Sequence, residues 1–191
     1  MKVIDRTRLR EALATEDQRF IDNHPRSRAL FEQARKNLLA GVPMNWMVRW
    51  ASPFPVFVNE AHGAHFNDVD GNTYLDLCLG DTGAMTGHTP QSTVDAITQQ
   101  LQRGLTYMLP TENALWVGAE LERRFGLPFW QFTLTATDAN RFALRLARHI
   151  TGRSKILVFN WCYHGTVDET FITLTDGKLH AREGNLGPAV D

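Results

Sequence analysis

The chain has few cysteines, no excess of charge of one sign and no long apolar run. Its 191 residues include two cysteines, Cys78 and Cys162, and two such widely spaced thiols are more typical of free buried side chains than of a disulfide framework. The 20 basic and 21 acidic residues leave a formal net charge of -1. This balance gives no basic stripe, so we expect no nucleic acid among the partners.

No apolar run approaches the ~20 residues that a membrane-spanning helix needs. The first 20 residues mix acidic and basic side chains and contain no apolar core like that of a signal peptide. We therefore expect a cytoplasmic protein that does not contact a membrane. Hydrophobic residues make up 43% of the chain and charged residues 21%, which is a globular composition and excludes a disordered chain.

The N-terminal part predicts two helices followed by an apolar loop. Apolar residues recur at helical spacing over residues 5–39, with a break at His24-Pro25, because proline disfavours a helix at the preceding residue. Ser27 is the expected cap of the second helix. Residues 44–58 are rich in aromatic residues and cannot be one helix, because they contain two prolines. This loop either packs on the core or forms the wall of a ligand pocket.

A small antiparallel meander is expected next. Strand patterns cover residues 56–58, 65–66 and 73–77, and Asp70-Gly71 is a strong hairpin signal between alternating segments. Two helices follow, over residues 90–104 with Thr89 as the cap, and over residues 111–126.

The most informative stretch is a strand, a turn of small residues and a strongly amphipathic helix. We predict a strand over 130–134, a turn at 135–137, a helix over 138–151 and an apolar strand over 155–159, which together make a βαβ unit. We assign the arginines of this helix to a solvated face; they are Arg141, Arg145 and Arg148. The last stretch, 174–191, is expected to be a loop.

The turn before this helix is a candidate phosphate site. A helix start presents free backbone N–H groups and a positive dipole end to one point in space. Thr135 and Thr137 add two hydroxyls there. The residues alone leave a second interpretation equally open, in which one threonine only caps the helix.

Several motifs occur together in an order and spacing that resembles the class III (ω-type) aminotransferases, in particular the glutamate-1-semialdehyde aminomutase-like enzymes and the β-amino-acid aminotransferases. These motifs cover most of residues 27–175 and are, in chain order, Phe66–Asp76, Gly87-His88, Thr135–Asn140 with Ala143–Arg148, Thr151–Arg153 and Tyr163-His164-Gly165. The resemblance implies an α/β protein with the aspartate-aminotransferase-like fold, fold type I of the pyridoxal-phosphate (PLP) enzymes, with a mainly parallel sheet covered by helices on both faces. Family enzymes are much longer, so the chain resembles their N-terminal portion. Residues 1–79 would form N-terminal helices and the small-domain meander, and residues 80–191 the first part of the large PLP-binding domain.

The resemblance also assigns cofactor roles. Thr135, Ala136 and Thr137 would hold the phosphate of pyridoxal 5'-phosphate, at a turn that in the family usually reads Ser-Gly-Thr. The Ala136 departure would strain the loop if that position needed a positive φ. Tyr163 would stack on the pyridine ring and His164 would lie beside the cofactor, although a core tyrosine and a structural histidine are the alternatives. Gly165 would let the backbone approach the ligand closely.

On the substrate side, Trp46 stands about where β-amino-acid relatives often place a carboxylate-binding arginine, and Arg49 lies nearby. The lysine that binds the cofactor covalently and the aspartate that pairs with the pyridine nitrogen have no counterpart in residues 1–191. None of Lys2, Lys36, Lys155 and Lys178 stands in a matching context. We therefore place no catalytic residue and no metal site in this segment.

The function implied by the resemblance is PLP-dependent transamination of an amino acid or amine to a keto acid or aldehyde by a longer enzyme. Its partners would be a small amino donor, a keto acceptor and a second copy of the enzyme in a homodimer. A PLP-dependent aminomutase or racemase is the first alternative, since a scaffold does not fix the chemistry. A catalytically dead remnant that acts as an interaction module is the second.

Overall fold

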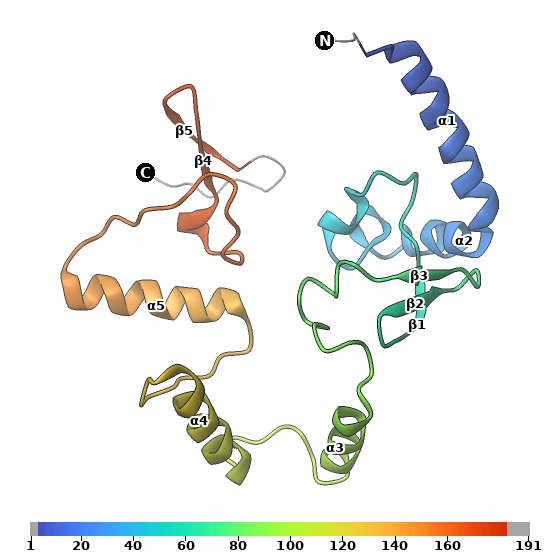
Figure 1. Cartoon of the computed structure of the whole chain (residues 1–191). Coiled ribbons are helices and arrows are strands. Elements are labelled where there is room, and N and C mark those ends of the chain that lie inside the picture. The colour runs from blue at the N-terminus through green and yellow to red at the C-terminus, as the bar shows by residue number, and fades with distance from the viewer. Residues whose placement is uncertain (1–3, 183–191) are drawn as a thin grey trace. The chain divides into compact units, whose positions relative to one another are not determined.

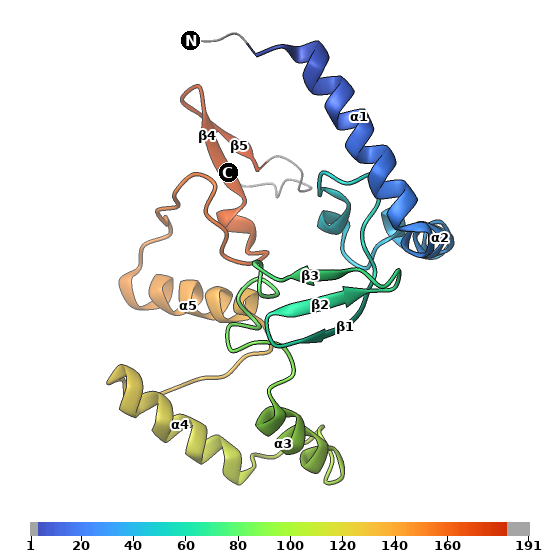
Figure 2. The ribbon, with the colours of Figure 1, turned by 45° about the vertical axis from the view of Figure 1, so that its right-hand side comes forward.

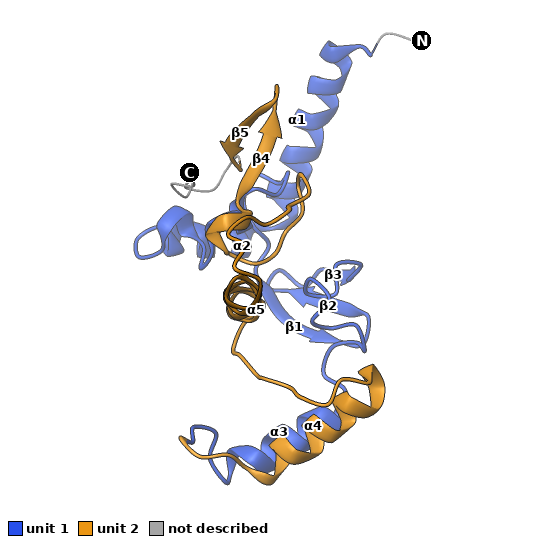
Figure 3. Cartoon of the chain, turned by 90° about the vertical axis from the view of Figure 1, so that its left-hand side faces the viewer, with its two compact units in different colours: residues 1–107 blue, residues 108–191 orange. Residues whose placement is uncertain are grey.

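The computed structural model describes residues 4–182 of the chain. It divides into two compact units, residues 1–107 (unit 1) and residues 108–191 (unit 2), coloured separately in Figure 3. The predicted boundary between a small and a large domain at 79/80 concerns a longer enzyme and stays a prediction. No helix in residues 4–182 is both long enough and apolar enough to cross a bilayer.

Unit 1 begins with the two predicted helices, α1 (Arg6–Asn23) and α2 (Pro25–Ala34). The break falls at His24 because Pro25 takes the first position of α2, where its missing N–H costs nothing. Ser27 is not the cap that we expected, since it lies inside α2. Instead the carboxylate of Asp70 accepts hydrogen bonds from the N–H groups of Arg26 and Ser27 at 2.6 and 2.9 Å, so a distant turn caps this helix.

The predicted meander is present as the antiparallel sheet β1-β2-β3 (Figure 2). Its strands are β1 (Val58–His62), β2 (His65–Asp68) and β3 (Thr73–Leu75). The first strand begins two residues later than predicted and continues to His62, past its predicted end at residue 58. The register pairs Phe66 with Tyr74, whose rings stack at 4.8 Å.

Unit 1 is organised around a buried polar network. The Asp68 side chain is fully buried and accepts hydrogen bonds from the Tyr74 hydroxyl at 2.9 Å and from the Asn72 backbone N–H at 2.8 Å. His24 lies between Tyr74 and the Phe20 carbonyl, with 2.6 Å contacts to both. Buried polar groups need hydrogen-bond partners. Here these partners come from both elements, so the network joins the end of α1 to the meander.

The rest of unit 1 consists of short elements and one helix. They are η1 (Leu39–Gly41), η2 (Asn45–Val48) and α3 (Gln91–Leu101). Thr89 does not cap α3 as expected: its φ is +48° and its hydroxyl lies 2.7 Å from the His62 ring, so Pro90 takes the cap position.

Unit 2 contains the two helices that the sequence predicts and a hairpin that it did not (Figure 1). Its elements are α4 (Glu112–Phe125), α5 (Ala136–Thr151), η3 (Asp168–Thr170), β4 (Ile172–Thr175) and β5 (Lys178–Ala181). Gly126 and Gly152 end the two helices with φ of 69° and 66°, as glycine does at helix ends. The prediction of a loop from residue 174 was wrong as far as residue 181, and residues 183–191 lie outside the described part.

The segments 130–134 and 155–159, predicted as strands, pair with no neighbour among the described residues. A parallel strand is stabilised by ladders on its sides and not by a local turn. Because α5 connects the two segments as predicted, the order of the βαβ unit is kept while its sheet is not formed within residues 4–182.

Candidate functional site

The start of α5 is built by a threonine cap. Thr135 has an extended backbone, and its hydroxyl accepts a hydrogen bond from the Asp138 N–H at 3.1 Å. The same hydroxyl donates to the Asp138 carboxylate at 2.8 Å. Both hydrogen-bonding roles of the Thr135 hydroxyl are therefore taken up inside the helix start.

Two backbone donors at this helix end have no acceptor among residues 4–182. Among the described residues, none accepts a hydrogen bond from the N–H of Ala136 or of Thr137, which are the first two residues of α5. Ala136 has no positive φ, so alanine in place of glycine causes no strain here. The strain that a positive φ at Ala136 would have caused is therefore absent.

The loop after residue 160 is tied to the same helix start. The Thr166 N–H donates to the Thr137 hydroxyl at 2.9 Å, and the Asn140 amide donates to the His164 carbonyl at 3.0 Å. Gly165 has φ +75°, and a side chain there would lie 2.4 Å from the Thr137 hydroxyl and 2.8 Å from its Cα. The close approach that Gly165 permits is thus to α5, within this chain.

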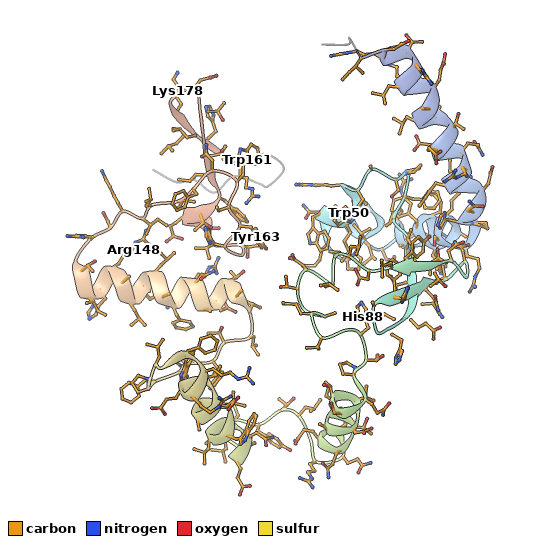
Figure 4. All side chains as sticks on the ribbon, viewed as in Figure 1. Trp50, His88, Arg148, Trp161, Tyr163 and Lys178 are labelled. Atoms are coloured by element: carbon orange, nitrogen blue, oxygen red, sulfur yellow. The ribbon has the colours of Figure 1, made fainter. Side chains whose placement is uncertain are left out.

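The Tyr163 side chain of this loop stays largely exposed. Tyr163 is 63% exposed, and His164 is also exposed. Figure 4 shows Tyr163 on the side of the N-terminal end of α5, with Arg148 toward the other end of the helix. The structure brings Tyr163 to the same part of unit 2 as residues 135–137, and its contact with a cofactor ring stays a prediction.

The arginines of α5 were assigned to a solvated face; Arg141 and Arg145 are exposed, whereas Arg148 is half-buried and the assignment was wrong for it. Arg141 donates to the Thr166 carbonyl at 3.2 Å, and Arg148 forms a 2.6 Å ion pair with Glu169. The Arg148 guanidinium holds the pKa of the Glu169 carboxyl below its usual value. Arg145 is exposed and lies over the Phe142 ring, 5.3 Å from its centroid.

The predicted substrate-side residues belong to unit 1. Trp46 lies in η2, is 45% exposed and contacts Trp50 edge to face at 6.3 Å between ring centroids. Arg49 follows η2 and donates its backbone N–H to the Trp46 carbonyl at 3.0 Å. A cavity of about 30 Å³ lies among residues 31–55, but neither Trp46 nor Arg49 lines it, so their role at a substrate stays a prediction.

Sequence reasoning missed a histidine–carboxylate pair in unit 1. The His88 ring lies 2.6 Å from the Asp76 carboxylate, which also accepts hydrogen bonds from the N–H groups of Cys78 and Leu79, both at 2.9 Å. The hydrogen bond from His88 holds the pKa of the Asp76 carboxyl below its usual value. The sequence also did not predict the contacts of Asn140, Thr166 and Arg182. A polar residue that contacts a distant loop leaves no periodic signal in the sequence.

Comparison with known proteins shows which family the chain resembles. Residues 46–189 match the family model Aminotransferase class-III. The chain is 37% identical over 155 residues to a protein named glutamate-1-semialdehyde 2,1-aminomutase from Methanocaldococcus jannaschii, an alignment that covers 81% of this chain and 36% of that protein. The chain thus spans about a third of the length of that relative.

Solved structures give the same result. The crystal structure of a glutamate-1-semialdehyde aminomutase from Pseudomonas aeruginosa has 49% sequence identity and a TM-score of 0.90, covering 95% of this chain and 40% of that one. A variant of it was solved in complex with PMP. A β-phenylalanine aminotransferase from Variovorax paradoxus has 32% identity and a TM-score of 0.77, covering 82% and 36%.

These neighbours have fold type I of the PLP enzymes, which confirms the predicted fold class, and PLP is the cofactor of the family. By its matched segment and its relatives, this chain belongs to the class III aminotransferases.

Proposed function

We propose that the protein, at the length of its relatives, is a PLP-dependent enzyme that moves the amino group of a small substrate. The N-terminal end of α5 would hold the cofactor phosphate and Tyr163 would cover the pyridine ring. The observation that supports this proposal is the pair of free N–H groups of Ala136 and Thr137 at the start of a 16-residue helix.

The donors at this turn fit a phosphate. The Thr137 hydroxyl accepts a hydrogen bond from the Thr166 N–H and has one other polar neighbour among the described residues, the Thr166 hydroxyl at 3.4 Å, so its own proton would be available to an oxyanion when one is bound. Arg141, bound to the Thr166 carbonyl, adds a positive charge nearby. Thr135 would contribute by shaping the turn, because its hydroxyl already donates to Asp138.

When bound, PLP supplies an electron sink for chemistry at an amino-bearing carbon. The residues of this chain bind and orient it: the α5 start fixes the phosphate, and the loop of residues 160–166 presents Tyr163 to the ring. His164 would lie at the edge of the site, since its carbonyl is held by Asn140 while its ring is exposed. The residue that binds the cofactor covalently would come from elsewhere in the enzyme.

An aminomutase is the reaction that the relatives support first. The Methanocaldococcus jannaschii and Pseudomonas aeruginosa proteins both carry this name. Transamination is the second candidate, because the Variovorax paradoxus enzyme is named an aminotransferase and shares 32% of the sequence. A homodimer and small amino-bearing substrates are proposed with either reaction, and Trp46 and Arg49 are proposed as part of a substrate wall.

Cofactor binding is tested with threonine-to-valine variants of the full-length protein. Thr137→Val removes one donor, and we expect the Kd of PLP to rise about tenfold, as loss of a hydrogen bond to a charged group predicts. Thr151→Val is the matched control, because the Thr151 hydroxyl bonds the Ala147 carbonyl at the other end of α5. Equal affinity of both variants and the parent would refute the phosphate assignment.

The reaction is tested with glutamate-1-semialdehyde supplied alone and together with a keto acid. An aminomutase converts the single substrate to a product with the amino group on carbon 1. A transaminase requires the keto acid and forms a second amino compound. A PLP-loaded protein inactive toward this and other amino donors would support neither and would leave the remnant hypothesis.

A further inference from the structure

We propose that Arg182 is a positioning residue for the Tyr163 ring. It acts through hydrogen bonds that join the end of the β4–β5 hairpin to the backbone just before Tyr163. This inference rests on the proposed function, because it concerns the same ring. It gives the Tyr163 ring a second structural support, which comes from the hairpin and is separate from the support given by α5.

The hairpin holds the loop from one side. Asn160 and Leu174 form two reciprocal hydrogen bonds, from the Asn160 amide to the Leu174 carbonyl at 3.1 Å and from the Leu174 N–H to the Asn160 side-chain oxygen at 2.9 Å. The Arg182 guanidinium donates to the Cys162 carbonyl at 2.9 Å and to the Trp161 carbonyl at 3.3 Å. The backbone N–H of Arg182 in turn donates to the Phe171 carbonyl at 2.9 Å, which fixes where the side chain starts.

Helix α5 holds the loop from the other side, beginning with the His164 carbonyl and the Thr166 N–H. Tyr163 is the residue between the two sets of contacts. Among the described residues, none forms a hydrogen bond with its backbone or hydroxyl, and its ring is 63% exposed. The position of the ring is therefore set by the residues on either side of it.

The backbone on the hairpin side is unusual. Trp161 has φ +65°, a conformation that is uncommon for a bulky side chain and persists only where the surroundings hold it. The carbonyls of Trp161 and of the next residue are the two that Arg182 binds. A planar guanidinium can donate to both at once, whereas an ammonium is a single point of charge.

Removing the guanidinium should therefore loosen residues 161–163 and leave the α5 contacts in place. The phosphate donors of Ala136 and Thr137 do not involve Arg182. The expected effect is a change in how the aromatic ring meets the cofactor, with a smaller loss of affinity than a phosphate-site variant gives.

The experiment uses the full-length protein and compares Arg182→Gln with Lys178→Gln. Lys178 lies on the same hairpin, is exposed, and its side chain forms no hydrogen bond with the described residues. We expect Arg182→Gln to weaken the visible circular dichroism of bound PLP, to raise the Kd of PLP by less than the about tenfold expected for Thr137→Val, and to speed amide exchange at residues 161–164. Arg182→Lys should restore part of the signal, and Lys178→Gln should match the parent in all three measurements.

A double-mutant cycle with Tyr163→Leu separates positioning from general damage. If Arg182 acts through Tyr163, Arg182→Gln adds little to the loss of dichroism and affinity caused by Tyr163→Leu. A full, additive effect would overturn the inference, as would a normal cofactor spectrum in Arg182→Gln when Tyr163→Leu changes it. Either result leaves the proposed function intact. Failure of the parent enzyme to bind PLP would overturn both proposals.

Discussion

The carboxylate of Asp70 accepts a hydrogen bond from the Ser27 hydroxyl at 2.7 Å and another from the Ser27 backbone N–H at 2.9 Å. A residue of the β2–β3 turn thus caps a helix that precedes it by 43 positions in the chain. Burial raises the pKa of the Asp70 carboxyl, but the hydrogen bonds from Ser27 and Arg26 outweigh burial and hold that pKa below its usual value.

Asp70→Asn should loosen the start of α2. The neutral amide loses the favourable interaction of a charge with a helix N-terminus, and we expect the local opening free energy of α2 to fall by about 1–2 kcal/mol. Hydrogen exchange at the amides of residues 26–28 in the full-length protein measures this change. Asp5→Asn is the control, because Asp5 caps only α1. Unchanged protection in α2 would contradict the capping role.

The ionisation of Tyr74 should lower the stability of unit 1 at alkaline pH. Burial and the hydrogen bond to the Asp68 carboxylate raise the pKa of Tyr74 from the ordinary value of 10.0 to about 12. A raised pKa means that the contribution of neutral Tyr74 to stability is complete below about pH 10 and is lost as the pH rises toward 12.

The measurement is a titration of tyrosine absorbance in the full-length protein. Tyr74→Phe should lack one late ionisation step near pH 12 that the parent shows. Tyr107→Phe, at a half-exposed tyrosine of the same unit, should keep that step. If the step lost in Tyr74→Phe lies near pH 10, as for an ordinary tyrosine, the hydroxyl is not buried against Asp68.

Gly165→Ala should disrupt the loop that carries Tyr163. The added methyl would meet the backbone of Thr137 at 2.8 Å, and φ is +75°, so we expect a loss of about 3 kcal/mol together with weaker PLP binding. Gly177→Ala is the matched control: its φ is +73° but nothing lies within 4 Å, so only the backbone cost of about 1 kcal/mol applies. Thermal unfolding and PLP titration of both variants test this, and equal losses would exclude the steric contact.

Ala136→Gly restores the residue that the family usually has, and we expect no gain from it. Ala136 lies in the first turn of α5 with no positive φ, so glycine offers no relief of strain and lowers helix stability by up to about 1 kcal/mol. The PLP affinity of the variant should equal that of the parent or fall below it. Tighter binding would show that the bound state needs a backbone conformation that alanine resists.

Arg148→Gln should cost stability where Arg145→Gln does not. Arg148 pairs with Glu169 and also donates to the Ser154 carbonyl at 2.9 Å, whereas Arg145 forms no hydrogen bond or ion pair with residues 4–182 and lies over the Phe142 ring of its own helix. Because the pair is about one third exposed, we expect only about 1 kcal/mol for Arg148. Chemical denaturation of both variants measures the difference, and a larger loss for Arg145→Gln would reverse the assignment.

The sequence predicted those elements whose signals are local. The helices over residues 6–34 and 136–151 follow from periodicity, proline and glycine. The β4–β5 hairpin could have been found, because Asp176-Gly177 repeats the signal that was used at Asp70-Gly71. Both Asp176 and Gly177 have a positive φ, 51° and 73°, as in a type I′ turn.

The signals that failed are long-range ones. The strands predicted at 130–134 and 155–159 depend on partners that a local pattern does not contain. The cap of α2 comes from residue 70, and the arginines of α5 bind a loop more than twenty residues further along. For the candidate site, motif order indicated the α5 turn and Tyr163, while the supports from Asn140, Thr166 and Arg182 appear only once the chain is folded.

Asp70 belongs to the β2–β3 turn and also caps α2, which has a consequence for protein engineering. A meander moved into another scaffold without its leading helices would carry an acidic group whose partners were left behind. Conversely, a redesigned turn that keeps the hairpin but omits this carboxylate would expose the first turn of a helix far upstream. Grafts and chimeras of this region should therefore exchange residues 25–75 as one piece.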